Sequence, residues 1–404
     1  MKFEIKKVFS KTLNKVLFLI MTVLVVLMSL QCVNDARYVD ESGNTIKGIV
    51  AARNLKEEKN KWKGYITEDV LSKIIATEHE IVSSADYNSD DVTKQEIAYS
   101  KMQSYDDIRH IINENYSGWD DYDYYKIDNM SSSDVSGFYN RRIELLKSYF
   151  AEEPNMSDEE QDYYLEKYET INTPLYYEYC DGWKSIIADN YMVPILLIIT
   201  VATGIILCGV YAEDFRYNSA AIYFSTAYGR EKGTKGKLQA VIAVATAIYA
   251  FEILLYTLIV LGGLGFSGGG CPIQLYKWKS YYDITLAQGY LLSVIGGYIG
   301  LIFIVLLAAF LSAKTKNILV GAIVPFVITC LFPFIGRIPV LIPIFQHFPH
   351  MILQVSQLFK YLIVYNVSGH LVGIIELLFI TYFVLSVFLI PINMRVFKKI
   401  KVYE

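Results

Sequence analysis

The sequence predicts an all-α polytopic membrane protein with six transmembrane helices and a helical extracytoplasmic domain between the first and the second. Composition gives the first indication: 53% of the 404 residues are hydrophobic and the mean hydropathy is +0.30, yet 19% of the residues are charged. The charges are unevenly placed, since 33 of the 41 acids but only 17 of the 37 bases lie between Asp35 and Asp189. An acidic domain and an apolar bundle are therefore expected in different parts of the chain.

Six apolar runs give the second indication, because a bilayer core of about 30 Å requires about 20 apolar helical residues. The predicted organisation is a cytoplasmic segment at 1–15, a first span at 16–33, an acidic domain at 34–190 and a bundle at 191–404. A cleaved signal peptide is the alternative for 16–33, but the small residues of a cleavage site are poorly placed there. The other five runs are 192–211, 238–261, 286–311, 318–335 and 371–390.

The distribution of Lys and Arg gives the third indication and predicts the orientation. With the N-terminus inside the cell, the inner segments hold 16 Lys and Arg residues, and the short outer segments hold four. The positive-inside rule therefore predicts a multi-pass protein of the bacterial plasma membrane with both termini cytoplasmic and 34–190 outside.

Two further segments are predicted to be helices that lie along the bilayer. Residues 1–15 form a basic amphipathic pattern that leads into the first span. Residues 351–363 have helical apolar spacing after a proline-broken stretch, which predicts an interfacial or re-entrant helix on the outer side. A seventh span is the alternative for 351–363, but it would place the basic C-terminus outside.

The acidic domain is predicted to be helical, without an alternating strand pattern. Thr67 and Ser157 are predicted N-caps, the latter in a capping box with Glu160. Further helices are expected continuously over 91–116, and from Ser136 or Gly137 to Phe150.

Tyrosines and cysteines of this domain leave alternatives open. The tyrosine clusters favour packing in a small helical core over a recognition surface for a cationic peptide or a sugar. Cys32 and Cys180 flank the domain and either pair in a disulfide or remain free thiols. The clustered tyrosines are Tyr122, Tyr124, Tyr125, Tyr163, Tyr164, Tyr168, Tyr176, Tyr177 and Tyr179.

No catalytic or metal-binding constellation is found, so the sequence predicts neither an enzyme nor a metalloprotein. The five histidines are scattered, and no GxSxG motif occurs. The segment 229–237, GREKGTKGK, differs from a Walker A loop because Glu231 and Leu238 stand where Gly and Ser or Thr are required. No cofactor is expected to bind directly, and nothing predicts a nucleic-acid partner.

The inner loop at 212–237 carries the most informative pattern. It begins with acids, has an apolar centre of small residues, and ends with bases. This layout resembles the permease subunits of the ABC-2 type family of ABC transporters, in which a Glu, a small polar residue and a Ser-Thr-x-x-(Gly/Ser)-Arg turn precede a Lys. The matching residues are Glu213, Ser219, Ser225, Thr226, Gly229, Arg230 and Lys235.

The resemblance implies an exporter permease that uses ATP through a separate ABC ATPase subunit. It implies six spans, a coupling helix in 212–237 that docks on the ATPase, and a homodimer or a heterodimer with another permease. The expected substrate is an amphipathic or peptide-like molecule, and the acidic outer domain favours a cationic one. A four-span exporter with a large outer domain is a rival within the same class. From another class, a non-transporting receptor or sensor with an extracellular recognition domain is the alternative, and for the loop alone the alternative is a stop-transfer segment.

Two glutamates fall inside the predicted spans. Glu252 lies near the middle of the third span and Glu376 in the outer part of the sixth. Because a carboxylate in hydrocarbon is costly, both are expected to face the bundle interior or a water-filled path. A substrate or gate contact and a hydrogen-bonded structural glutamate are equally compatible with this position.

Overall fold

Helices dominate the computed structural model, which describes residues 1–154, 156–216, 220–221, 225–226 and 228–399. Within these residues, six helical segments are long and apolar enough to cross a membrane, as in a multi-pass membrane protein. This confirms the predicted number of spans. The segments are α2 (Thr12–Asn34), α10 (Asp189–Arg216), α12 (Thr234–Leu264) with the π-helical turn η3 (Gly229–Gly233) before it, α13 (Leu286–Thr315), the stretch Ile318–Ile335, and α18 (Ile374–Lys399).

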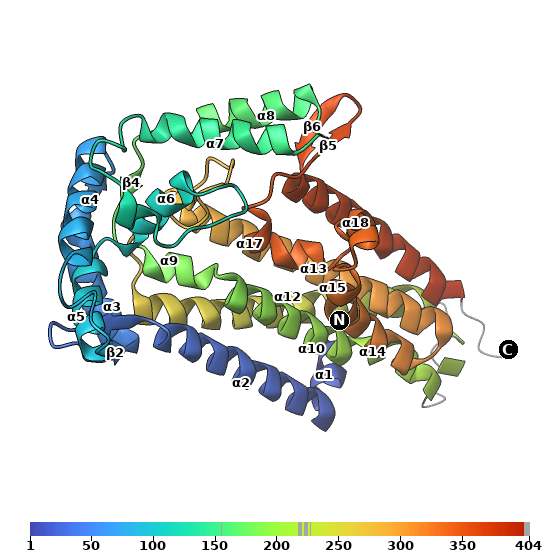
Figure 1. Cartoon of the computed structure of the whole chain (residues 1–404). Coiled ribbons are helices and arrows are strands. Elements are labelled where there is room, and N and C mark those ends of the chain that lie inside the picture. The colour runs from blue at the N-terminus through green and yellow to red at the C-terminus, as the bar shows by residue number, and fades with distance from the viewer. Residues whose placement is uncertain (155, 217–219, 222–224, 227, 400–404) are drawn as a thin grey trace.

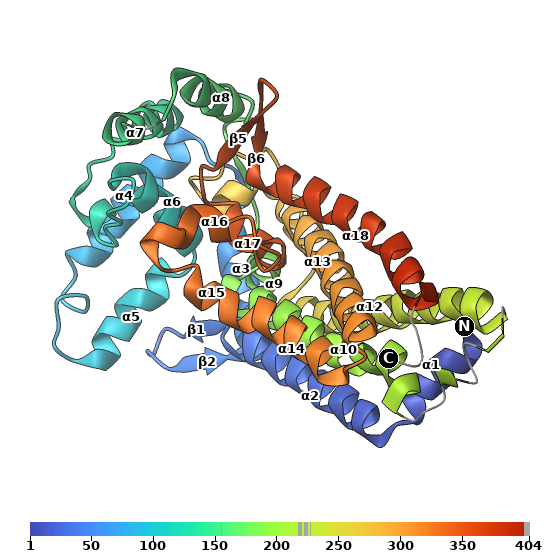
Figure 2. The same cartoon turned by 90° about the vertical axis from the view of Figure 1, so that its right-hand side faces the viewer.

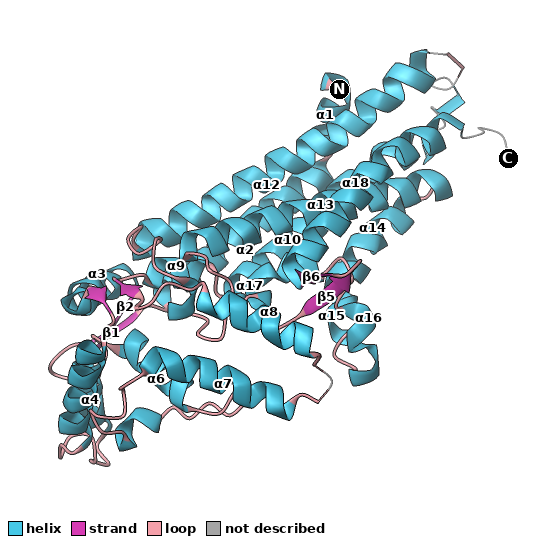
Figure 3. Ribbon diagram, turned by 90° about the horizontal axis from the view of Figure 1, so that it is seen from above, coloured by secondary structure: helices cyan, strands magenta, loops and turns pink. Residues whose placement is uncertain are grey.

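The six segments run side by side and form one bundle, with α1 (Lys2–Ser10) and the C-terminal end of α18 at the same end (Figures 1 and 3). The domain between α2 and α10, which we call the inter-span domain, lies at the opposite end. Helix α13 is central, because it contacts α10, α12, α18 and α14 (Ile318–Phe326) (Figure 2).

The stretch Ile318–Ile335 is helical but interrupted. Asn317 caps α14 by accepting a hydrogen bond from the Leu319 amide, and Pro325 near its end removes a backbone donor. A π-helical turn, η5 (Val327–Leu331), follows and leads into α15 (Phe332–Ile335). Pro325 also packs against α10 so closely that a Cβ at Gly204 would lie 2.4 Å from its ring.

The segment between α15 and α18 corrects the prediction of a single helix at 351–363. Its elements are short turns rather than long helices: η6 (Pro339–Leu341), α16 (Ile342–Phe345), η7 (Met351–Gln354) and α17 (Val355–Leu358). A hairpin of β5 (Val364–Val367) and β6 (His370–Gly373) then precedes α18, so the last span begins at Ile374 and not at 371.

The segment 336–373 turns back into the bundle, and we call it the re-entrant segment; its predicted place on the outer side of a membrane stays a prediction. Ile352 and Leu353 are buried and pack on Gly300 of α13, where a Cβ would lie 2.7 Å from both side chains. Gly300 lies about 21 Å along α13 from Leu286, at about 1.5 Å per residue. Near Gln354 the chain forms two short turns and not one straight helix. These turns place Ile352 and Val355 against glycines of α13.

The N-terminal helix is shorter than predicted. Residues 1–15 do not form one helix, because Lys11 is extended and separates α1 from α2. The Asn14 amide donates hydrogen bonds to the carbonyl oxygens of Val8 (2.8 Å) and Ile206 (3.3 Å). Asn14 thus satisfies a carbonyl that the end of α1 leaves open and fixes α1 against α10.

The inter-span domain is largely helical, and the predicted caps are confirmed. Thr67 accepts from the Val70 amide, and Ser157 and Glu160 form the complete capping box. Gly137 precedes α7 with a φ of +70°. The helices are α3 (Gly48–Lys59), α4 (Glu68–Val82), α5 (Val92–Met102), α6 (Asp106–Tyr116), α7 (Phe138–Glu152), α8 (Asp158–Glu169) and α9 (Asp181–Ile186), with the 3-10 turns η1 (Asn60–Trp62) and η2 (Lys126–Asn129).

Two features of this domain were predicted wrongly. Two short antiparallel ladders are present, β1 (Arg37–Val39) with β2 (Thr45–Lys47) and β3 (Gly64–Tyr65) with β4 (Tyr176–Tyr177). The expected helix at 91–116 is also broken between α5 and α6. Gln103 at this break hydrogen-bonds both backbone groups of Val39 (2.9 and 2.7 Å), so its side chain fastens β1 to the end of α5.

Some of the clustered tyrosines are buried in the core and others are exposed, and the cysteines are free. Four tyrosines, Tyr164, Tyr168, Tyr177 and Tyr179, are buried in the core, whereas Tyr122, Tyr124 and Tyr125 are exposed. Cys32 and Cys180 do not pair. The Cys32 thiol donates to the Ser185 carbonyl oxygen (3.6 Å), and the Cys180 thiol interacts with that of Cys271.

Candidate functional site

A cluster of six charged residues joins α1, α10 and α12 at the end of the bundle that lies away from the inter-span domain. We call it the charge cluster. Its pairs are Lys7–Asp214 (2.8 Å), Lys237–Asp214 (2.9 Å), Lys237–Glu4 (3.2 Å) and Lys11–Glu213.

Lys237 lies at the centre of the charge cluster. Its side chain is 1% exposed, and its ammonium group also donates to the Val210 carbonyl oxygen at 2.9 Å. Burial opposes the charge of the nearby Lys7, but the hydrogen bond to Asp214 and the neighbouring carboxylates outweigh it and raise the pKa of Lys7. Removing Lys237 would therefore leave Glu4 without its cation and Asp214 with Lys7 alone.

The structure places the predicted loop residues in three different settings. Glu213 is buried in the last turns of α10, not in a loop. Ser225, Thr226 and Lys235 are exposed, whereas Ser219 lies outside the described residues. The structure thus brings Glu213 into the charge cluster and leaves three of the other predicted residues at the surface.

The turn at Gly229 and Arg230 is ordered by local contacts and by α18. The Gly229 amide donates to the Thr226 hydroxyl oxygen (3.0 Å), which fixes the start of the π-helical turn η3. The Arg230 guanidinium donates to the carbonyl oxygen of Lys398 at 2.9 Å. Arg230 therefore ties the start of α12 to the end of α18.

A groove of about 510 Å³ lies beside this turn, between the N-terminus and η3. Two exposed aromatic side chains flank it, Phe3 (75% exposed) and Tyr228 (68% exposed). Lys232 stacks over the Tyr228 ring at 4.4 Å, which holds that ring at the surface. We call this the aromatic groove; its remaining lining residues are Met1, Glu4, Thr226, Gly229, Gly233 and Gly236.

The two glutamates predicted inside the spans differ from each other. Glu252 is fully buried between α12 and α2 and accepts a hydrogen bond from Thr22 at 2.5 Å, as expected for an interior carboxyl group. Glu376 is exposed in the first turn of α18, so it does not face the bundle interior, and the other possibility, a water-filled path, stays a prediction. The reason is the β5–β6 hairpin, which delays the start of the helix and puts Glu376 where an acid favours a helix N-terminus.

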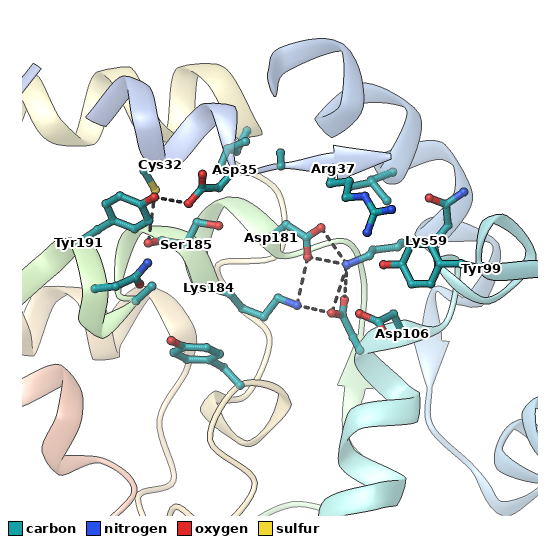
Figure 4. Close-up of a pocket in the computed structure, with 18 residues that line it drawn as sticks. Cys32, Asp35, Arg37, Lys59, Tyr99, Asp106, Asp181, Lys184, Ser185 and Tyr191 are labelled. Atoms are coloured by element: carbon teal, nitrogen blue, oxygen red, sulfur yellow. Dashed lines mark hydrogen bonds and ion pairs between the residues drawn. The ribbon is translucent and has the colours of Figure 1, made fainter. Parts of the chain in front are cut away.

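A second polar region lies at the junction of the bundle and the inter-span domain, and no motif pointed to it. Figure 4 shows Lys59 from α3 and Lys184 from α9 directed at the aspartates beside them. Lys59 lies 3.1 Å from Asp107 and 2.8 Å from Asp181, and Lys184 lies 3.1 Å from Asp181 and also pairs with Asp107. A pocket of about 420 Å³ adjoins these four residues.

The charges of this junction are matched and mostly desolvated. Burial alone would raise the pKa of Asp107, but the charges of Lys184 and Lys59 prevail and hold it well below its ordinary value. The Tyr177 hydroxyl adds a hydrogen bond to Asp107 at 2.9 Å. Two lysines neutralise two aspartates, so the arrangement fits a fastening between domain and bundle better than a site for a charged ligand.

The loop between α12 and α13 provides further fastenings. Buried Arg142 of α7 donates to the Ser280 carbonyl oxygen (2.8 Å) and stacks over Tyr168 at 4.2 Å. The Tyr168 hydroxyl donates to the Lys279 carbonyl oxygen (2.6 Å), and the Lys279 ammonium pairs with Glu114 at 2.9 Å. The inter-span domain is therefore bound to the bundle through this loop as well as through its two chain connections.

Sequence reasoning missed Lys59, Lys184 and the central role of Lys237. A lysine followed at once by an apolar helix, as Lys237 is, gives a weak signal, because such a residue normally marks the membrane surface. Comparisons with protein-family models and with curated proteins give no match to this chain.

Proposed function

We propose that this chain is the permease subunit of an ATP-driven ABC exporter of the ABC-2 type, anchored in the bacterial plasma membrane with both termini in the cytoplasm. In this proposal the charge cluster and the aromatic groove are on the cytoplasmic side. The inter-span domain then lies outside the cell, where a substrate leaves. ATP is hydrolysed on a separate ATPase subunit.

The aromatic groove is the observation that carries this proposal. Large aromatic side chains that stay exposed at the polar end of a bundle are expected to be covered by a partner. Phe3 comes from α1 and Tyr228 from the turn before α12, so one partner surface would touch both elements at once. The exposed Ser225, Thr226 and Lys235 extend the same surface.

The charge cluster supports a transmission role. Because Lys237 binds carboxylates of α1 and α10, a push on α1 or on the η3 turn moves three helices as a unit. Contiguous ion pairs of this kind provide a path by which ATP-driven closure of a partner can reach the spans. The α18 end is included through Arg230.

The domain outside would act on the substrate that emerges. Its charge balance between Asp35 and Asp189 is 33 acids against 17 bases, which attracts cations. This supports an amphipathic or peptide-like, cationic substrate. Dimerisation with a second permease is part of the same proposal.

The test is a substitution on the aromatic groove with a matched control. Tyr228→Glu puts a charge on the proposed docking surface, and Tyr65→Glu puts the same charge on an equally exposed tyrosine (62%) of the inter-span domain. We expect Tyr228→Glu to abolish co-purification of an ABC ATPase with this chain from the membrane, while Tyr65→Glu leaves it intact. Equal retention of the ATPase by both variants would contradict the proposal.

A receptor without transport remains the second candidate, favoured by the exposed Tyr122, Tyr124 and Tyr125 beside acidic residues of the inter-span domain. A receptor would bind its ligand through Tyr122, Tyr124 and Tyr125. It would do so without an associated ATPase activity in the membrane. ATP-dependent movement of substrate in vesicles that contain both chains therefore distinguishes the two.

A further inference from the structure

A cavity of about 840 Å³ lies between α10, α15 and the re-entrant segment, away from the charge cluster and from the junction with the inter-span domain. Its volume is within the range of about 300–1,000 Å³ that small-molecule sites occupy. Its walls are mainly apolar and include Leu197, Phe345 and Leu358.

The cavity opens onto the apolar outside of the bundle. Phe334 and Ile342 line it, and their side chains are 66% and 46% exposed. In a membrane such side chains face lipid, so acyl chains of the bilayer have direct access to the cavity.

Two polar groups in the cavity point to what fills it. His350 lines the cavity and is 3% exposed, and its Nδ1 atom has no hydrogen-bond partner among the residues that the structure describes. Arg337 lines the same cavity just beyond α15, and within the described residues its guanidinium forms no ion pair and only stacks on Phe334, at 5.4 Å. An uncompensated buried imidazole nitrogen is costly, and a guanidinium at an apolar rim is a strong phosphate binder.

We propose that this cavity binds one phospholipid of the surrounding bilayer, with an acyl chain between α10 and the re-entrant segment and the phosphate at Arg337. An ester carbonyl of the glycerol backbone would accept a hydrogen bond from His350. This bond would give the Nδ1 atom the partner that it lacks among the described residues. The proposal stands without the proposed function, because it concerns a lipid that the membrane supplies and not the molecule that is transported.

Cys330 provides a natural reporter, because it lines the cavity with a partly exposed thiol. The full chain would be purified in detergent, and the alkylation rate of Cys330 by N-ethylmaleimide would be followed by peptide mass spectrometry. Dioleoylglycerol, which lacks the phosphate, serves as the comparison. We expect dioleoyl phosphatidylglycerol to slow the reaction at a concentration about tenfold lower, because only its phosphate can bind Arg337. A tenfold difference in affinity corresponds to about 1.4 kcal/mol. Soluble glycerol 3-phosphate, the head group alone, should give no protection.

Matched variants separate binding from misfolding. Arg337→Gln should remove the difference between phosphatidylglycerol and dioleoylglycerol, and Arg337→Lys should keep part of it. Lys360→Gln, which removes a cation outside the cavity lining, should leave the difference unchanged. His350→Leu should weaken protection by both lipids, whereas His347→Leu, an exposed histidine that does not line the cavity, should not.

Three results would overturn the proposal. Equal protection by both lipids in the natural sequence would mean that phosphate is not recognised. An alkylation rate of Cys330 that neither lipid changes would mean that no lipid enters the cavity. Protection that depends only on protein concentration would mean that a second copy of the chain covers the cavity instead.

Discussion

The ammonium of Lys237 in α12 lies 2.9 Å from a carboxylate oxygen of Asp214 in α10, and the lysine side chain is almost completely buried. The same ammonium reaches Glu4 of α1 at 3.2 Å. One cation thus holds α1 to the neighbouring ends of α10 and α12, at the end of the bundle where coupling is proposed.

Replacing Lys237 by Met should therefore strongly destabilise the bundle. The change keeps an apolar stem of similar length but leaves Glu4 without its cation and Asp214 with Lys7 alone, at a cost of about 3–5 kcal/mol. The thermal unfolding midpoint in detergent measures this loss. Lys235→Met, two residues away and exposed, should change the stability by less than about 0.5 kcal/mol. A similar midpoint for both variants would show that the charge cluster contributes little to stability.

The glycines of α13 give a second prediction. Gly300→Ala should destabilise the protein by about 1–3 kcal/mol, because its Cβ would lie 2.7 Å from Ile352 and Leu353 and would push the re-entrant segment away. Gly262→Ala in α12 has nothing within 4 Å and should be neutral or stabilising by up to about 1 kcal/mol. Proteolysis within the segment 336–373 should accelerate in the first variant only. Equal proteolysis of the two variants would argue against the close packing on α13.

The junction with the inter-span domain should respond to acid but not to mild changes of pH. The pKa of Asp107 is held below its ordinary value, so its contribution to stability is complete above about pH 3.9, the value for an unfolded aspartate, and is lost as the pH falls below it. The difference in unfolding midpoint between the natural sequence and Asp107→Asn should thus be constant from pH 7 to pH 5 and should shrink below about pH 4. A difference that already shrinks between pH 7 and pH 6 would show that another group controls the junction.

Arg230 tests whether the turn η3 passes movement of a partner to the spans, as the proposed function requires. Arg230→Glu loses the hydrogen bond to the Lys398 carbonyl oxygen and places a carboxylate beside it. We expect membrane insertion to persist and ATP-driven transport to be abolished. Lys314→Glu makes the same charge change at an exposed position of α13 that does not line the aromatic groove, and it should keep the tie to α18. Normal transport by the Arg230 variant would contradict the coupling role of this turn.

Much of the architecture was predictable because the signals are local. Long apolar runs fix the spans, and caps such as Ser157 with Glu160 act on amides three residues away. The failures depend on distant contacts. Gln103 interrupts a good helical pattern because it binds Val39, 64 residues earlier in the chain.

The candidate site was predictable only in part, for the same reason. The pattern at 212–237 led to Glu213 and Arg230, but it gave no sign that the partner of Glu213 is Lys11, 202 residues away. Lys237 resembled a residue that marks the membrane surface, and only the packing of α1 against α10 and α12 buries it. The break at Lys11, which makes this packing possible, has no sequence signal that we recognise.

The 21-residue connection between α12 and α13 (265–285) joins two spans and also holds the inter-span domain through Ser280, Lys279 and Trp278. A change in the angle between these two spans must therefore displace the domain. By thermodynamic linkage, a molecule that binds the domain more tightly in one of its positions also shifts the balance between arrangements of the spans. In the proposed exporter, a ligand bound to the inter-span domain would then alter the ATP turnover of the partner subunit without itself crossing the membrane.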